Sequence, residues 1–317
     1  KPFRYTIDRV FSVKGAGTVV TGTAFSGTVK VNDEIYLSTG QKVRIKAIHA
    51  QNTSSEQGIA GQRLALNLSV DLDRTPMKRG DWLLQDEPLS PTDRISVQIL
   101  AEVPLNESQP VHIYHGASRT TGKLTLLQGK NAAKNDRTLA EIILDSPLFL
   151  AFGDKLILRS GDAKSLIAGA RVLEIDSPKR HKRTEGRLSF LANLALAENA
   201  AQRIAFILQH NAISAHKLMW IEQLTNKQLD DAINERSAVR YQDWCFNTDY
   251  KKEKIQLILT ALNTYHEQHN DQLGVSKARL YRMAALNQPE NLINHFIDEM
   301  LEEGRLQQTR GWLHLPE

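Results

Sequence analysis

The chain has 317 residues, 41% hydrophobic and 24% charged, a composition that supports about two to four folded domains. A net charge of +4 and an isoelectric point near 9.0 form a mild basic excess, compatible with a nucleic-acid partner without requiring one. The single cysteine excludes a disulfide framework, and no apolar run reaches the length of a membrane span, so we expect a cytoplasmic protein without membrane contact.

The first half of the sequence repeats with a period of two residues. Phe3, Tyr5 and Ile7 alternate with polar residues, which is typical of a strand with one buried face. Short runs of the same kind follow, separated by Gly, Asn, Asp and Pro: GTVVTGTA, GTVKV, EIYLS, KVRIKAIHA, RLALNL, DWLLQ, RISVQILAEV, VHIYHG, GKLTLL, AEIILD, DKLILRS and ARVLEI. The proline-containing stretch DEPLSPTDR divides them into two sets. We predict two all-β barrels, over residues 1–89 and 90–176.

A basic connector, SPKRHKR at Ser177–Arg183, precedes a change to the helical period. Leu188, Leu191 and Leu194 share one helical face. From here the chain repeats one plan loosely: a long helix, a short helix, a longer helix and an apolar hairpin. The short helices are expected at Ser214–Gln223 and Ser276–Leu286, the longer ones at Asn226–Asn234 and Glu290–Glu303, and the hairpins in SAVRYQDWCFN and GRLQQTRGWLHLP.

Three helices closed by a β-hairpin form the winged-helix plan. We therefore predict two tandem winged-helix domains, the first within residues 177–247 together with the connector, and the second over residues 248–317. Thr225 and Ser276 are the expected N-caps of two of these helices.

The glycine-rich stretch Ser12–Asp33, SVKGAGTVVTGTAFSGTVKVND, raises the question of a phosphate-binding loop. No Lys-Ser or Lys-Thr follows Gly22, and Val20 stands where a dinucleotide fingerprint needs its third glycine. In NKQLD, Leu229 occupies the position where guanine recognition requires Asp. We predict no nucleotide-binding machinery and no catalytic residues in this chain, and interpret the glycines as turns and close backbone contacts within a barrel.

Two further groups of reactive residues have plain structural interpretations. Cys245 lies between Trp244 and Phe246 and is expected to be a packed strand residue rather than a nucleophile. His266 and His269 share a helical face in HEQH, but zinc needs three or four ligands and no companion cysteines exist. We expect a solvated helix end and no metal site.

Several segments resemble known translation factors. GAGTVVTGTAFSGTVKVNDEIYL, IAGQRLALNL and RGDWLL resemble the second domain of GTPases related to elongation factor Tu. PVHIYHGASRTTGKLTLL, SPLFLAFGDKLILR and IAGARVLEI resemble the third. Together with the tandem winged helices, IDRVF and GQR, they make the chain resemble the selenocysteine-specific elongation factors of bacteria over essentially its whole length.

The resemblance implies a GTPase domain, with GTP and magnesium, upstream of Lys1, and further winged helices downstream that bind the messenger hairpin recoding UGA. This part of the factor would then carry no cofactor of its own. The implied partners are selenocysteyl-tRNA and the ribosome, reached by a protein that we expect to be monomeric.

The resemblance also implies a pocket for selenocysteine, formed by Asp8, Arg9 and Arg63. His49, in KAIHAQN, is a further candidate for this pocket, although a lone histidine on a strand is more often structural. Selenocysteine is largely a selenolate at neutral pH, and arginine offers fixed positive charge and a fork of donors. Arg9 lies two residues after Ile7, on the same face of a regular strand, and would therefore face the core. The alternative interpretation is that both arginines are exposed strand residues paired with neighbours such as Asp8.

Two basic clusters are candidates for RNA contact. The connector contributes Lys179, Arg180, Lys182 and Arg183, and the short helix of the second winged module contributes Lys277, Arg279 and Arg282. The inner winged modules are alternatively a spacer, which we prefer. A β-barrel regulator with DNA-reading winged helices is the competing function, although the presumed recognition helices lack a dense basic stripe.

Overall fold

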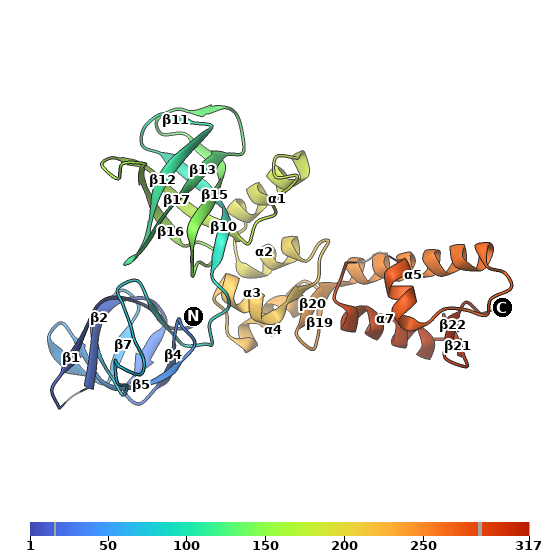
Figure 1. Ribbon diagram of the computed structural model, residues 1–317, viewed down its shortest axis with the longest axis horizontal. Helices are drawn as coiled ribbons and strands as arrows, with labels where there is room; N and C mark the ends of the chain where they lie inside the picture. Colours follow the sequence, from blue (N-terminus) through green and yellow to red (C-terminus); the bar gives the residue numbers. More distant parts are fainter. Residues whose placement is uncertain (16, 285–286, 317) are drawn as a thin grey trace. The chain divides into compact units, whose positions relative to one another are not determined.

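The computed structural model describes residues 1–15, 17–284 and 287–316 (Figure 1). It contains two compact units. One consists of Lys1–Leu196 and Met219–Thr225, and the other of Ala197–Leu218 and Asn226–Glu317. The predicted barrels lie in the first unit and most of the winged-helix region lies in the second, so the predicted fold class is confirmed.

The first barrel is antiparallel, in the order β4-β9-β1-β2-β8-β5-β6, and a pairing of β4 with β5 closes it. Its strands are β1 (Arg4–Val13), β2 (Gly17–Ser26), β4 (Glu34–Leu37), β5 (Lys42–Ala50), β6 (Thr53–Ser55), β8 (Arg63–Leu68) and β9 (Trp82–Leu84), with β3 (Thr28–Lys30) and β7 (Gln57–Ile59) as a separate pair. Every second residue of these strands faces inward, and residues such as Tyr5, Val20 and Leu66 form the core of the barrel. The period of two in the sequence therefore reports the pleat of these strands.

The start of β1 is buried on both faces. Phe3, Tyr5 and Ile7 point into the first barrel, while the intervening Arg4 and Thr6 are also buried. Their partners belong to the second barrel: Arg4 pairs with Asp154, and the Thr6 hydroxyl accepts a hydrogen bond from the Ala117 amide. Polar residues at alternate positions therefore build the contact between the barrels.

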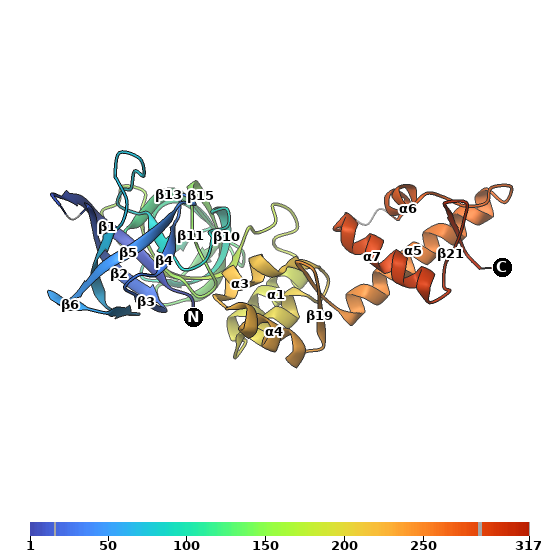
Figure 2. The same ribbon diagram turned by 90° about the horizontal axis from the view of Figure 1, so that it is seen from below.

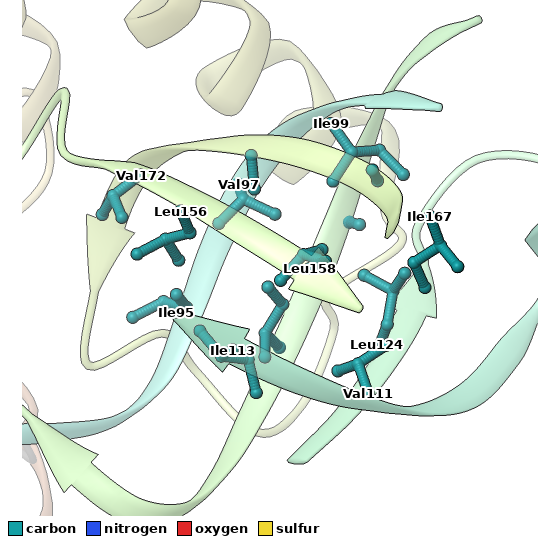
Figure 3. Close-up of a cluster of buried hydrophobic side chains, with 14 of the residues drawn as sticks. Ile95, Val97, Ile99, Val111, Ile113, Leu124, Leu156, Leu158, Ile167 and Val172 are labelled. Atoms are coloured by element: carbon teal, nitrogen blue, oxygen red, sulfur yellow. The ribbon is translucent and has the colours of Figure 1, made fainter. Parts of the chain in front are cut away.

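The second barrel is closed in the order β10-β15-β13-β12-β16-β17. The strands are β10 (Thr92–Ala101), β12 (Ser108–His115), β13 (Ser118–Leu126), β15 (Arg137–Leu148), β16 (Lys155–Ser160) and β17 (Leu166–Ile175), with β11 (Leu105–Asn106) and β14 (Asn131–Ala132) as a small extra pair. Branched side chains from these strands, including Val97, Ile113 and Leu158, meet in its interior (Figure 3).

The helix α1 (Glu185–Leu196) packs against β15 and β17 of this barrel. Arg187 of α1 makes a two-pronged ion pair with Glu174 of β17. The structure therefore assigns α1 to the barrel unit, whereas the sequence placed the whole of residues 177–247 in the connector and the first winged-helix domain. The short segment Met219–Thr225 also belongs to this unit, where the Trp220 indole donates to the Leu150 carbonyl.

The first winged module contains α2 (Ala200–Ile207), β18 (Ile213–Ser214), α3 (Ala215–Glu222), α4 (Asn226–Glu235), β19 (Ala238–Tyr241) and β20 (Trp244–Asn247). Its small sheet has the order β18-β20-β19. The expected hairpin is present, and Cys245 is buried in it as predicted.

The second winged module contains α5 (Thr248–Gln268), α6 (Lys277–Met283), α7 (Glu290–Glu302), β21 (Gln307–Thr309) and β22 (Trp312–His314). Figure 2 labels α5, α6, α7 and β21 of this module. Ser276 caps α6 as predicted, because its hydroxyl accepts from the Arg279 amide. The last residues of the predicted helix Ser276–Leu286, at 285–286, lie outside the described residues.

The two winged modules share an interface within their unit. Helix α5 begins directly after β20, with Asn247 as its N-cap. The first hairpin reaches α7: the Tyr241 ring stacks on His295 at 3.7 Å between centroids, and the Trp244 indole donates to Asn291 at 3.1 Å. These contacts join the two winged modules into one compact unit.

None of the helices in the described ranges combines the length and apolar character that crossing a bilayer requires.

Candidate functional site

The candidate site begins at a β-bulge in β1. Across the β1–β2 pair, Ile7 lies opposite Gly22 and Arg9 lies opposite Thr21, so Asp8 is an extra residue with no partner of its own. A bulge of this kind turns two consecutive side chains toward the same face. Asp8 and Arg9 therefore both lie on the outer face of the barrel.

The bulge overturns the parity on which Arg9 was expected to face the core. Arg9 is exposed, Phe11 is 44% exposed and Val13 is 39% exposed. A shift of one residue moves every later side chain of the strand to the other face. The sequence pattern of β1 is regular on both sides of Asp8 and did not reveal the shift.

Asp8 and Arg63 form a two-pronged ion pair. Arg63 Nη1 donates to Asp8 Oδ2 at 2.5 Å, and Nη2 donates to Oδ1 at 3.1 Å. Thr21 Oγ1 also donates to Asp8 Oδ1, at 2.8 Å. The hydrogen bond from Arg63, assisted by that from Thr21, holds the pKa of Asp8 below its usual value despite partial burial. The Arg63 side chain is 60% exposed, so its remaining N–H groups are accessible to a ligand.

One row of residues crosses the outer face beside this pair. Arg9 lies opposite Thr21, Thr21 opposite Ala65, and Ala65 opposite His49, across β1, β2, β8 and β5. A cleft of about 520 Å³ opens over the part of this row that Thr21, Ala65 and His49 form. Its lining residues are Thr21, His49, Gln51, Asn52, Gly61, Gln62, Arg63, Leu64 and Ala65.

The structure thus brings the sequence-predicted site residues to one face. Arg63 and His49 line the same cleft, Asp8 holds Arg63, and Arg9 stands at the opposite end of the row from His49. Neighbouring strands are about 5 Å apart, so Arg9 and His49 are separated by roughly 14 Å of backbone. The interpretation of Arg63 as paired with Asp8 and its interpretation as a pocket residue are therefore both compatible with this geometry.

Three basic residues of the barrel unit were not predicted from the sequence as candidates. Lys78, Arg79 and Arg119 line a second cleft, of about 650 Å³, in the barrel unit. Arg79 also donates to the Asp8 carbonyl at 3.4 Å and so borders the bulge. The available signal is the stretch KRGD at residues 78–81, in which two consecutive cations precede a glycine just before β9. Only its last three residues belong to the segment RGDWLL that carries the family resemblance.

The connector is held against the second barrel rather than extended in solvent. Lys182 Nζ lies 3.0 Å from Oε1 of the buried Glu141, and Arg183 Nη2 donates to the Leu126 carbonyl at 3.2 Å. Lys179 and Arg180 are exposed. The four connector candidates for RNA contact therefore divide into two that bind the barrel and two that face solvent.

The candidates in the second winged module also differ from one another. Lys277 pairs with Asp298 at 2.6 Å, and the Arg279 guanidinium lies 5.1 Å above the Tyr265 ring. Arg282 is exposed. These cations lie on α6, which precedes the helix that a helix-turn-helix unit uses for recognition.

The remaining reactive groups are engaged in structure. Burial raises the pKa of the Cys245 thiol to about 11. His266 Nε2 accepts a hydrogen bond from the Leu315 amide at 3.2 Å. Over the described ranges, no three His, Cys, Asp or Glu side chains are grouped closely enough to hold a metal ion.

Comparison with known families assigns three parts of the chain. Residues 17–84 match the model described as elongation factor Tu domain 2, and residues 92–179 match the model of the β-barrel domain of selenocysteine-specific elongation factor. Residues 259–315 match the model described as elongation factor SelB, winged helix. The site described above lies within or beside the first match.

Similar proteins cover the whole chain. A selenocysteine-specific elongation factor of Haemophilus influenzae is 88% identical over 317 residues, which are 100% of this chain and 51% of that protein. One of Escherichia coli is 40% identical, over 99% of this chain and 50% of that protein. The chain therefore spans about half the length of the curated relatives it matches.

A solved structure has the same fold. The crystal structure of a bacterial selenocysteine-specific elongation factor aligns with 100% of this chain and 50% of its own chain, with a TM-score of 0.72 at 22% sequence identity. Family models, close relatives and fold agree, and the chain belongs to the family of selenocysteine-specific elongation factors.

Proposed function

We propose that this chain is the part of a selenocysteine-specific translation factor that holds selenocysteyl-tRNA and spans toward the messenger. The observation that carries the proposal is the Asp8–Arg63 pair, fixed beside a cleft on the barrel that matches domain 2 of elongation factor Tu. In this proposal, the Arg63 guanidinium binds and recognises the selenocysteine side chain at the aminoacyl end of the tRNA.

The chemistry of Arg63 suits this task. Its guanidinium is charged at every physiological pH and presents five N–H groups, of which Asp8 engages two. A selenolate would accept hydrogen bonds from the others. A serine hydroxyl carries no charge, and a cysteine thiol, with a pKa near 8.5, is mostly neutral at pH 7. The anionic selenium atom would therefore gain most from this environment.

Asp8 has two roles in the proposal. It fixes the guanidinium through two parallel hydrogen bonds, which limits the rotamers of a long exposed side chain. It also supplies a carboxylate to which the free amino group of the aminoacyl ester can bind. His49 and Arg9, at the two ends of the same row, would contact neighbouring parts of the tRNA end.

Phosphate contacts would supply most of the affinity for tRNA. Lys78, Arg79 and Arg119 in the larger cleft and the exposed Lys179 and Arg180 are the cations best placed for it. Each neutralised phosphate adds affinity that falls as salt rises.

The winged pair fits the function of a spacer better than that of a DNA reader. The third helix of each module follows the helix-turn-helix plan, yet α4 has one Lys against two Asp and a Glu, and α7 has no Lys or Arg. Acidic helices repel a phosphate backbone. The first hairpin is also occupied by its contacts with α7.

The whole factor would act in the cytoplasm, delivering its tRNA to the ribosome at recoded UGA codons. GTP hydrolysis, with magnesium, would belong to a GTPase domain of the full-length protein, and messenger-hairpin binding to further winged helices. In this proposal, the residues described here bind tRNA and act as a spacer toward the messenger, and they do not hydrolyse GTP.

A comparison of three ligands tests the proposal. The full-length protein that contains this chain, loaded with GTP, is titrated with selenocysteyl-tRNA, seryl-tRNA and duplex DNA in gel-shift experiments at one salt concentration. We expect selenocysteyl-tRNA to bind more tightly than seryl-tRNA by at least about tenfold, and duplex DNA to bind weakly. Equal affinity for the two tRNAs, or preferential binding of duplex DNA, would overturn it.

A further inference from the structure

We propose that Thr21 and Gly22, neighbours on β2, are positioning residues for the Asp8–Arg63 pair. The missing side chain at Gly22 admits the bulge at Asp8, and the Thr21 hydroxyl then fixes the Asp8 carboxylate that holds Arg63. The inference rests on the proposed function, because it concerns how Arg63 is presented to a selenocysteine side chain.

The first observation concerns the space beside Gly22. A Cβ atom at this residue would lie 1.8 Å from the Thr6 carbonyl oxygen and 3.0 Å from Cζ of Tyr5. Backbone therefore fills the volume in which a side chain would stand. Gly22 lies opposite Ile7, the last residue of β1 before the register shifts. The close approach of the two strands at Gly22 and the extra residue at Asp8 are thus parts of one local geometry.

The same part of β1 is held from its other side. The Ile7 amide donates to the Asp81 carbonyl at 2.9 Å, and the Gly80 amide donates to the Ile7 carbonyl at 2.9 Å. These bonds restrain the Ile7 backbone, and the pairing of Thr6 with Trp82 of β9 restrains the residue before it. The chain has no freedom to relieve a collision at residue 22 by moving Thr6 away, so a larger residue there would displace the bulge.

The second observation concerns the Thr21 hydroxyl. Asp8 Oδ1 accepts from both Arg63 Nη2 and Thr21 Oγ1, while Oδ2 accepts from Arg63 Nη1. Arg63 alone cannot define the orientation of Asp8, because the guanidinium is itself on a long, mostly exposed side chain. Thr21 belongs to β2, so its hydroxyl has a fixed position and orients the carboxylate of Asp8, which in turn holds Arg63.

Thr21 also lines the cleft that Arg63 lines, at the centre of the row from Arg9 to His49. A shift of the Asp8 carboxylate would rotate the guanidinium and redirect the N–H groups that face the cleft. Thr21 therefore acts on selectivity through Asp8 and Arg63, without a contact to the selenium atom of its own.

Two substitutions at Thr21 separate its hydroxyl from its shape. Thr21→Val keeps the branched shape and removes the donor, whereas Thr21→Ser keeps the donor and removes a methyl group. The first readout, in this chain, is the carboxyl pKa of Asp8 followed by NMR. The second, in the GTP-loaded full-length protein, is the ratio of the dissociation constants for seryl-tRNA and selenocysteyl-tRNA.

We expect Thr21→Val to raise the pKa of Asp8 and to lower the ratio of dissociation constants by about tenfold. Thr21→Ser should leave both close to the parent values. An unchanged Asp8 pKa and ratio in Thr21→Val, or equal losses in Thr21→Ser, would overturn the positioning role.

The two proposals fail in distinguishable ways. If Thr21→Val raises the Asp8 pKa but leaves the ratio unchanged while Arg63→Ala abolishes selectivity, positioning by Thr21 is wrong and charge reading by Arg63 stands. If neither variant changes the ratio, the proposed function is wrong, whereas the raised pKa still supports the contact of Thr21 with Asp8.

Gly22→Ala tests the steric part separately. We expect it to lower the melting temperature steeply or to prevent folding, which supports the requirement for glycine. A Gly22→Ala protein with unchanged melting temperature and unchanged Asp8 pKa would contradict it.

Discussion

Arg4 and Asp154 join the two barrels through a buried two-pronged ion pair. Arg4 Nη1 lies 3.0 Å from Asp154 Oδ1 and Nη2 lies 2.7 Å from Oδ2, although the residues are 150 positions apart. The guanidinium also lies 5.3 Å from the centre of the Trp82 ring. Burial alone would raise the pKa of Asp154, but the positive charge of Arg4 together with the hydrogen bonds from His115 and Arg4 outweighs burial, so the pKa is strongly lowered.

Breaking this pair should destabilise the barrel unit. Asp154→Asn leaves the Arg4 charge buried without its counter-charge, and we expect a loss of about 3 kcal/mol in the free energy of unfolding, measured by urea titration. The double variant Arg4→Met with Asp154→Leu is the matched control, since it removes both charges and should lose less. A double variant no more stable than Asp154→Asn would contradict this account.

The same pair predicts a dependence on pH. Because the folded-state pKa of Asp154 is lowered, its contribution to stability is complete above the unfolded-state value of about 3.9 and is lost as pH falls below it. The stability difference between the parent chain and Asp154→Asn should therefore shrink between about pH 4 and pH 2. A constant difference over this range would show that the charge of Asp154 is not the cause.

Lys182 and Lys179 offer a matched pair within the connector. Lys182 contacts the buried Glu141, which also lies 3.1 Å from Arg94, so Lys182→Ala should lower the free energy of unfolding by about 1 kcal/mol and leave tRNA binding unchanged. Lys179→Ala should leave stability unchanged and reduce the slope of log affinity against log salt by about one. The opposite assignment of effects would refute the division of the connector into barrel-bound and solvent-facing cations.

The interface between the winged modules should show energetic coupling. A double-mutant cycle of Tyr241→Ala and His295→Ala removes the ring stack, and we expect a coupling free energy of about 1 kcal/mol from urea titrations followed by circular dichroism. If the two substitutions had additive effects on the free energy of unfolding, the modules would be independent. That result would argue against the proposed spacer role.

The buried thiol provides a simple check on the first winged module. Cys245 is the single cysteine, it is fully buried, and its pKa is raised to about 11 by burial. We expect Ellman's reagent to modify it only after unfolding in urea. Rapid stoichiometric reaction of the native chain would contradict the packed position of Cys245.

Local patterns in the sequence were sufficient to predict most of the fold. The period of two in the barrels follows from residues such as Phe3, Tyr5 and Ile7, which face one core. Ser276 predicts the start of α6 because capping is a local interaction. These features depend on neighbours within a few residues.

Features that depend on distant partners were not predictable. The bulge at Asp8 is compensated by Gly22 on another strand, and no pattern within β1 marks it. The burial of Arg4 depends on Asp154, and the assignment of α1 to the barrel unit depends on the pairing of Arg187 with Glu174. In the candidate site, residue identities came from the family resemblance, while the actual row from Arg9 to His49 required the strand registers.

In the proposed function, the charge of Arg63 distinguishes the amino acid that the tRNA carries. The most direct measurement compares Arg63→Ala with the parent in the GTP-loaded full-length protein, using the dissociation constants for selenocysteyl-tRNA and seryl-tRNA. We expect the affinity for selenocysteyl-tRNA to fall at least about tenfold while the affinity for seryl-tRNA changes little. Equal losses for the two tRNAs would contradict it.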